Sequence, residues 1–223
     1  MQTSDQDRQY PGCRLILASA SPRRRELMER FWAGRLQVIV PQFDERIVVE
    51  GWNKSPEELA IRLTAGKIDA LQAMPDLPTR YCALAADTLV VADTEILGKP
   101  VDAADAARHL RLLSGREHRV LTGLHVAFYQ DGRTDCLQTV EETTVRFADL
   151  DESVINWYIR TGEPFDKAGS YGIQGAGAAL VERIDGCYYN VMGLPVYRLL
   201  SLLREAADRF TSFAGLSDLL PWS

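Results

Sequence analysis

The chain has 223 residues, of which 46% are hydrophobic and 25% charged, a composition typical of folded globular proteins that excludes a disordered chain. Its uninterrupted apolar runs reach about five residues, whereas a transmembrane helix needs roughly 20, so we expect no membrane as a partner. Acidic residues outnumber basic ones by 31 to 25, and the net charge of −6 argues against nucleic acid as a partner.

The cysteines and the N-terminal residues indicate a cytoplasmic protein. The four cysteines lie far apart in the sequence and form no C-x-x-C pair, so we expect reduced thiols and no structural zinc site. Residues 1–12 are polar and contain no apolar stretch of signal-peptide length, and we expect them to form a disordered tail.

In chain order, the first half alternates predicted strands and helices. Arg14 to Ser19 is a short apolar run typical of a buried strand, and Ser21-Pro22 after it is a strong helix start. Ser55 begins a second helix through the S-x-x-E capping pattern. The remaining predictions for this half are a strand at 37–43, a loop at 44–54, an end of the second helix near residue 74, an apolar strand at 82–91 and a helix at 102–114.

The second half begins with two long extended segments. Residues 119–129 and 137–147 are rich in β-branched side chains, and Asp131-Gly132 between them indicates a hairpin, with a loop longer than two residues. The whole pattern predicts a mixed α/β fold with one sheet system and two lobes. The elements expected after the hairpin are a helix capped by Asp149-x-x-Glu152 and ending at Gly162, strands at 178–184 and 188–192, and a helix from about 195 to 210.

The segment from Ser19 to Arg25 is the first candidate site. It places two serines and three arginines at the start of a helix, where each cation is unfavourable by roughly 0.3–1 kcal/mol. A bound phosphate would offset the unfavourable positive charge at this helix start. Removal of Arg24 would then leave the stability of the ligand-free protein unchanged or higher. The alternative is a solvated basic run that pairs with Glu26 and Glu29.

Asp87 ends a nearly continuous apolar run, and Thr88 follows it. At the carboxyl end of a strand this carboxylate would face a ligand crevice, where it could hold Mg²⁺ or activate a water. The alternative is a buried aspartate that caps a loop or pairs with an arginine. Three lysines lie next to glycine, proline or alanine, namely Lys67, Lys99 and Lys167. Each could reach a phosphate as a point charge, although most surface lysines do not.

Glycines at 169, 172, 175 and 177 indicate a close approach of the backbone to another group. Gln174 among them offers a donor and an acceptor, which match the N3–H and a carbonyl of a uracil or thymine ring. The alternative is a flexible loop with a solvated glutamine.

His125 lies within a predicted strand, and we expect it to be packed rather than catalytic.

Several motifs occur together and in one order: LASASPRR at 17–24, FDE at 43–45, AADT at 85–88, GKP at 98–100, LSGREHRVLTG at 113–123, EPFDKAGSYGIQG at 163–175 and VMGLP at 191–195. In these motifs the chain resembles the Maf family of nucleoside triphosphate pyrophosphatases over about residues 14–205. The resemblance implies an elongated mixed β-sheet with flanking helices and two lobes around a nucleotide cleft, similar to the inosine triphosphate pyrophosphatases. It implies one domain at 13–207, and the C-terminal tail at 208–223 lies outside it.

The resemblance also implies roles for residues of this sequence. Asp87 would accept the proton of the attacking water, and Glu45 and Asp87 would lie near a divalent cation, Mg²⁺ or Mn²⁺. The Thr88 and GIQG pattern is similar to the dTTP/UTP subfamily, and a homodimer is expected. The alternative function is a nucleotide-binding regulator of cell division and septum formation that works through partners without significant turnover. The implied residues are Asp87, Lys99 and Glu45 for catalysis, and Ser19, Arg23, Arg24, Lys67, Thr88, Lys167 and Gln174 for substrate binding.

Overall fold

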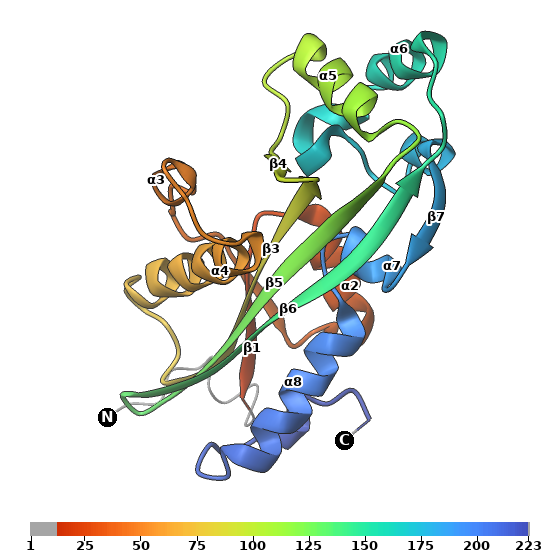
Figure 1. The fold of residues 1–223 in the computed structure, drawn as a ribbon. Coiled ribbons are helices and arrows are strands. Elements are labelled where there is room, and N and C mark those ends of the chain that lie inside the picture. Colours follow the sequence, from red (N-terminus) through yellow and green to blue (C-terminus); the bar gives the residue numbers. More distant parts are fainter. Residues whose placement is uncertain (1–12, 223) are drawn as a thin grey trace.

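The computed structural model describes residues 13–222, and its strands form one mixed sheet in the order β2-β1-β3-β5-β6-β7, with β4 paired to β3 (Figure 1). This arrangement confirms the predicted α/β class with an elongated mixed sheet flanked by helices. The expected tail at 1–12 lies outside the described residues. The strands are β1 (Arg14–Ala18), β2 (Leu36–Ile39), β3 (Arg80–Ala92), β4 (Glu95–Leu97), β5 (Glu117–Gln130), β6 (Arg133–Phe147) and β7 (Val181–Asp185).

Three long antiparallel strands, β3, β5 and β6, form the axis of the molecule (Figure 1). The short strand β1 runs parallel to β3 but pairs with it only from Tyr81 to Leu84, whereas β5 pairs with β3 as far as Val91. The second half of β3 therefore extends past the carboxyl end of β1. This open stretch of β3 carries the residues discussed below.

The helices gather in two groups along the axis (Figure 1). Around the lower half of the sheet, Ala83 and Ala85 of β3 pack beneath α4, while Cys82 and Leu84 face α2 and α8. Around the upper half, α5 and α6 enclose a separate core that includes Phe147. The helices are α2 (Pro22–Trp32), α3 (Arg46–Val49), α4 (Pro56–Gln72), α5 (Ala103–Leu113), α6 (Glu152–Arg160), α7 (Tyr188–Val191) and α8 (Val196–Arg209), with 3₁₀ turns η1 (Glu163–Asp166), η2 (Ala168–Ser170), η3 (Ala176–Leu180) and η4 (Ser217–Leu219).

The helix starts predicted at Ser21 and Ser55 are confirmed. The Ser21 hydroxyl accepts a hydrogen bond from the Arg24 backbone N–H, and Pro22 is the first residue of α2. Ser55 and Glu58 form the predicted capping box at the start of α4. Both signals operate within one turn, which is why sequence alone was sufficient to find them.

The hairpin predicted at Asp131-Gly132 is confirmed, whereas its expected loop length and the expected cap of α6 were wrong. The β5–β6 hairpin has a loop of only Asp131 and Gly132, because Gln130 pairs with Arg133, and both loop residues have positive φ. This is the tight hairpin geometry that an Asp-Gly pair favours. The cap of α6 is Asp151 rather than Asp149, and its carboxylate accepts from two backbone N–H groups of the first turn.

Three element predictions also need correction. The expected loop at 44–54 contains the short helix α3. The strand expected at 178–184 begins only at Val181, after a 3₁₀ turn, and the segment expected as a strand at 188–192 forms helix α7. Tertiary contacts decide this last case, because the Asn190 amide in α7 donates to the Val120 carbonyl of β5 and to the Thr143 hydroxyl of β6.

The C-terminal segment, for which the sequence indicated no role, packs against the domain. Phe213, Leu216 and Leu219 are buried in the same core as α2 and α8, and the Trp32 indole N–H donates to the Leu219 carbonyl at 2.6 Å. The proposed domain boundary at residue 207 stays a prediction. Within residues 13–222, no helix is both long and apolar enough to cross a lipid bilayer.

Candidate active site

Two carboxylates and one ammonium meet on the face of the sheet that α4 covers. Lys67 of α4 donates a hydrogen bond to the Asp87 carboxylate of β3, and its Nζ lies 2.8 Å from Glu45 Oε1. The Lys67 and Asp87 side chains are each 12% exposed, whereas half of the Glu45 side chain is exposed. The three residues lie far apart in sequence, so the fold alone forms this cluster, with Glu45 at its solvent side.

Two glycines allow α4 to come close enough for this contact. Gly123 of β5 is the register partner of Asp87, and a Cβ added there would lie 2.6 Å from the Ala60 carbonyl oxygen of α4. Gly66 of α4 is covered by the Phe43 ring, which leaves no room for a Cβ. Gly123 lies opposite Asp87 in the sheet, and Gly66 and Phe43 lie within two residues of Lys67 and Glu45 in the sequence. The two glycines therefore set the spacing between helix, sheet and the segment that carries Glu45.

Nearby cations determine the ionisation of Glu45. Partial burial raises the pKa of Glu45, but the positive charges of Lys67, Lys99 and Arg24 outweigh it, and the net pKa is lowered. Lys99 itself is exposed on the loop after β4. The site therefore combines an ionised glutamate with three basic side chains within electrostatic reach.

Arg24 is buried on the opposite face of β3. Its guanidinium donates to the Gly193 carbonyl at 2.8 Å, to the Thr88 hydroxyl at 3.1 Å and to the Ser19 hydroxyl at 3.3 Å. Burial lowers the pKa of Arg24, while the negative charges of Asp87 and Glu45 act in the opposite direction. The structure thus brings together Ser19, Arg24 and Thr88, and it makes Arg24 part of the packed framework.

The three arginines of the α2 N-terminus have different environments. Arg25 forms an exposed pair with Glu29, as the solvated alternative expects, whereas Arg24 points inward. Arg23 Nη1 lies 3.4 Å from Asp166 Oδ2 on η1. One basic run therefore contains both a solvated pair and residues directed at the site, and neither simple interpretation of the sequence is complete.

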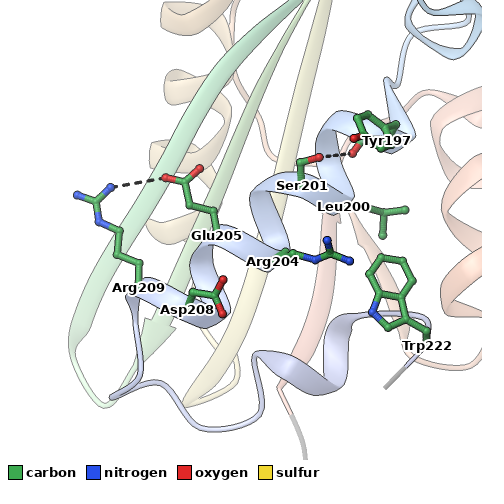
Figure 2. A pocket seen from close by; sticks show the side chains of 8 residues that line it. All are labelled: Tyr197, Leu200, Ser201, Arg204, Glu205, Asp208, Arg209 and Trp222. Atoms are coloured by element: carbon green, nitrogen blue, oxygen red, sulfur yellow. Dashed lines mark hydrogen bonds and ion pairs between the residues drawn. The ribbon is translucent and has the colours of Figure 1, made fainter.

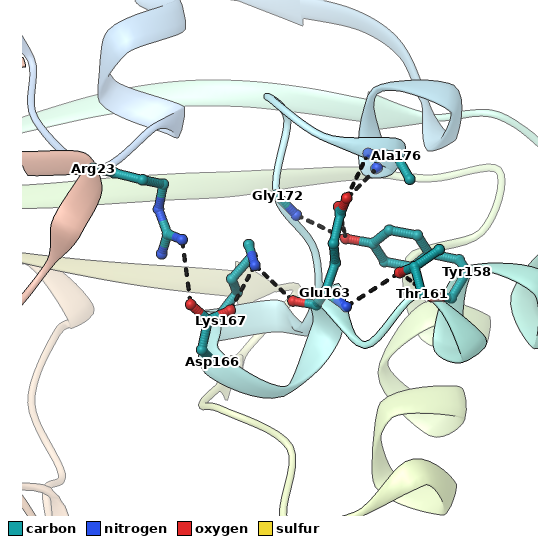
Figure 3. Close-up of polar contacts among 9 residues, drawn as sticks. Arg23, Tyr158, Thr161, Glu163, Asp166, Lys167, Gly172 and Ala176 are labelled. Carbon is teal, nitrogen blue, oxygen red and sulfur yellow. Dashed lines mark hydrogen bonds and ion pairs between the residues drawn. The ribbon is translucent and has the colours of Figure 1, made fainter. Parts of the chain in front are cut away.

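Lys167 and Asp166 link α2 to the glycine-rich loop (Figure 3). The Lys167 ammonium donates to Asp166 Oδ1 at 2.5 Å and to the Glu163 backbone carbonyl at 2.7 Å. The Lys167 side chain also lies against Gly172, where a Cβ would approach its Cδ to 2.7 Å. Gln174, two residues further on, is exposed and makes no side-chain hydrogen bond to any residue between 13 and 222.

The position of Asp87 differs from the prediction. Asp87 lies within β3 rather than at its end, and its side chain points to the opposite face from Thr88 because side chains alternate along a strand. It still occupies an open edge, because the parallel neighbour β1 has already ended at Ala18. The open edge at Asp87 therefore arises from the length of β1 and not from the length of β3.

A buried polar chain extends from Thr88 across the sheet, and the sequence analysis missed it. The Thr88 and Thr122 hydroxyls are 2.9 Å apart, and Thr122 donates to the Asn190 carbonyl. The signals were present, since Thr122 lies in the LTG motif and Asn190 precedes VMGLP.

His125 is packed, as expected. It is buried and contacts Gln138, and burial lowers its pKa to about 4.

The carboxylates of Glu45 and Asp87 fit a magnesium or manganese ion in donor chemistry. Oxygen atoms of both converge on one cation, the Lys67 ammonium. Within residues 13–222 no group of three or more His, Cys, Asp or Glu side chains could hold a metal ion. Mg²⁺ usually takes one or two protein carboxylates together with substrate phosphates, so two convergent carboxylates suffice.

A surface groove lies elsewhere in the described part of the chain. It has a volume of about 620 Å³ and lies between the exposed face of α8 and Trp222 (Figure 2). None of the predicted site residues lines it.

The fold and this cluster define an α/β protein with a mixed acidic and basic site at the open edge of its sheet. The family model described as Maf-like protein matches residues 14–206, and the chain belongs to the Maf family. Similar curated proteins carry the name dTTP/UTP pyrophosphatase. The protein from Symbiobacterium thermophilum is 48% identical, with 90% of this chain and 98% of that protein covered. The protein from Shewanella oneidensis is 43% identical, with 86% and 97% covered.

Proposed function

We propose that this protein hydrolyses nucleoside triphosphates to the monophosphate and pyrophosphate and prefers dTTP and UTP. It would be a nucleoside triphosphate diphosphatase, a hydrolase of phosphorus anhydrides. The observation that carries the proposal is the convergence of Glu45 and Asp87 on Lys67, within electrostatic reach of the buried guanidinium of Arg24. The names of the similar proteins support the same activity.

In this proposal Asp87 accepts the proton of the water that attacks the triphosphate. Lys67 exchanges its carboxylate partners for a phosphate oxygen, which frees Asp87 to act as a base. Negative charge develops on the departing pyrophosphate, and cations that are already in place stabilise it. The proposed cations are Lys67, Lys99, Lys167, Arg23 and Arg24, together with the Ser19 hydroxyl.

Glu45 and Asp87 would hold the divalent cation, Mg²⁺ or Mn²⁺. When bound, this ion neutralises phosphate charge and lowers the pKa of water. The lowered pKa of Glu45 supports this assignment, because the ionised carboxylate is the form that binds a cation.

Gln174 and Thr88 are proposed to set the base preference. The Gln174 amide has no partner within the described residues, so it can accept from the N3–H of uracil or thymine and donate to a ring carbonyl. Cytosine lacks the N3–H, and one unsatisfied polar group costs about 1–3 kcal/mol, equivalent to roughly 5- to 150-fold in selectivity.

We further propose a homodimer in the cytoplasm. The alternative, a nucleotide-binding regulator of cell division, requires binding without turnover and no catalytic base. The cluster of Asp87, Glu45 and Lys67 favours the enzyme, because nucleotide binding alone has no need of such a base.

Pyrophosphate release should be measured for dTTP, UTP, CTP, dATP and dGTP with Mg²⁺ or Mn²⁺. We expect dTTP and UTP to be hydrolysed well ahead of CTP and the purines. Gln174→Glu removes the amide donor and should depress dTTP and UTP hydrolysis, whereas Gln37→Glu on the exposed side of β2 is a matched control. Nucleotide binding without pyrophosphate release would contradict the proposed hydrolase activity. An unchanged order of nucleotide preference in Gln174→Glu would contradict the assignment of Gln174 to the base.

A further inference from the structure

The Glu163 carboxylate lies inside the glycine-rich loop that carries Gln174 (Figure 3). Its Oε1 accepts from the Ala176 backbone N–H at 2.8 Å, and its Oε2 accepts from the Gly177 N–H at 3.3 Å. Two adjacent backbone donors just after Gln174 are thus held by one carboxylate. Because one carboxylate accepts both hydrogen bonds, these contacts restrain the backbone of the loop.

Tyr158 completes this contact from the other side of the loop. Its hydroxyl donates to Glu163 Oε2 at 3.3 Å and accepts from the Gly172 N–H at 3.1 Å. The Tyr158 side chain is fully buried in the core between α5 and α6, so the anchor for the loop is part of the packed domain.

The glycines of the loop make room for these same groups. A Cβ at Gly175 would collide with the Glu163 carboxylate, and one at Gly177 would lie 2.8 Å from the Tyr158 hydroxyl. The close approach that the glycine pattern predicted is therefore, at these two positions, an approach to the protein's own side chains. Gln174 lies between residues whose backbone is fixed, although its own side chain is exposed.

Glu163 also holds the cationic part of the same segment. Its backbone carbonyl accepts from the Lys167 ammonium, and its N–H donates to the Thr161 hydroxyl at 3.1 Å. One residue thus connects the proposed phosphate-binding lysine with the proposed base-reading glutamine. The base and the phosphates of a nucleotide are covalently linked, which limits the distance between them, so this connection matters for recognition.

We propose that Glu163 is a positioning residue that fixes the loop of residues 172–177 and thereby determines the base selectivity of Gln174. This inference rests on the proposed function, because it assigns Gln174 to the base. Glu163 acts through the loop backbone and does not itself touch the substrate.

The test compares Glu163→Gln with wild type and with Glu182→Gln, an exposed β7 glutamate, as a matched control. Dissociation constants of the non-hydrolysable α,β-imido analogues of UTP and CTP are measured by calorimetry, and hydrogen exchange of residues 172–177 by mass spectrometry. In Glu163→Gln the amide replaces one acceptor with a donor that faces one of the two backbone N–H groups. We expect faster exchange in the loop and a loss of about tenfold in the UTP-to-CTP preference, as for one lost hydrogen bond.

Two further variants separate positioning from a general structural effect. Tyr158→Phe keeps the buried ring and removes the hydroxyl, so it should change exchange and selectivity in the same direction by a smaller amount. In a Gln174→Ala background, Glu163→Gln should have no further effect on the UTP-to-CTP ratio, because the residue through which it acts is gone.

An equal loss of affinity for UTP and CTP in Glu163→Gln, or unchanged loop exchange, would overturn the proposal. So would a full selectivity effect in the Gln174→Ala background. Because these readouts are binding and exchange, they are independent of turnover. Wild-type protein that binds UTP selectively but releases no pyrophosphate would refute the proposed function and leave this inference to be judged by its own readouts.

Discussion

Replacement of Arg24 by alanine tests whether this residue is part of the folded framework. The charge at the positive end of α2 is unfavourable, so its removal alone would stabilise the ligand-free protein by about 0.3–1 kcal/mol. The structure opposes this, because Arg24 is only 9% exposed and donates to Gly193, Thr88 and Ser19.

The partners decide the magnitude. Thr88 keeps its contact with Thr122, and Ser19 keeps the hydrogen bond from the Ser21 N–H. The Gly193 carbonyl is buried and loses its 2.8 Å hydrogen bond, which costs about 1–3 kcal/mol. Removal of a cation from the positive end of α2 offsets part of this cost. We therefore expect the free energy of unfolding to fall by about 1–2 kcal/mol, and the melting temperature to fall by roughly 2–8 °C.

Arg23 provides the matched control on the neighbouring residue of the same helix. Its pair with Asp166 is 3.4 Å long, with side chains 30% and 64% exposed, so Arg23→Ala should change stability by about 1 kcal/mol or less. The assay is thermal unfolding without nucleotide, monitored by circular dichroism. If Arg24→Ala melts at or above the temperature of Arg23→Ala, Arg24 is not part of the framework and this reasoning is refuted.

Three further outcomes are expected. Asp87→Asn should retain the fold and UTP binding but lose roughly 10²–10⁴-fold in turnover, measured by pyrophosphate release, and a variant with half the wild-type rate would exclude Asp87 as the base. Gly123→Ala should lower stability by about 1–3 kcal/mol because its Cβ would meet the Ala60 carbonyl, whereas Gly98→Ala, with no atom within 4 Å, should not; equal melting temperatures would contradict this. Burial lowers the pKa of His118 and His125 from 6.5 to about 4, so the unfolded chain takes up protons in this range before the folded one does. The free energy of unfolding should therefore fall as the pH drops from 6.5 to 4, by on the order of 3 kcal/mol per histidine, and His118→Phe should reduce that fall in urea titrations.

The sequence by itself determined the local structure and the chemistry of the candidate site. Ser21 and Ser55 set helix starts through hydrogen bonds within one turn, and these signals need no other part of the chain. The ordered motifs from Ser19 to Gln174 were enough to indicate a nucleotide-processing protein. Residue type and local spacing carry this information, because the chemistry requires the same groups wherever the fold places them.

Only the tertiary structure decided which groups meet. Asp87 and Thr88 are neighbours in sequence, yet they serve opposite faces of β3, one toward Lys67 and the other toward Arg24. Contacts across the chain also turned residues 188–191 into a helix and brought the C-terminal segment into the core.

The glycines show most clearly why the sequence does not identify the partners of a residue. Glycine leaves room for another group at both Gly123 and Gly175, but the sequence does not name the group, and it indicated a close approach only at Gly175. In the fold these groups are the Ala60 carbonyl and the Glu163 carboxylate, the first 63 residues and the second 12 residues away in the sequence. A missing side chain leaves space in any conformation, and only the packing of the other elements determines what fills it.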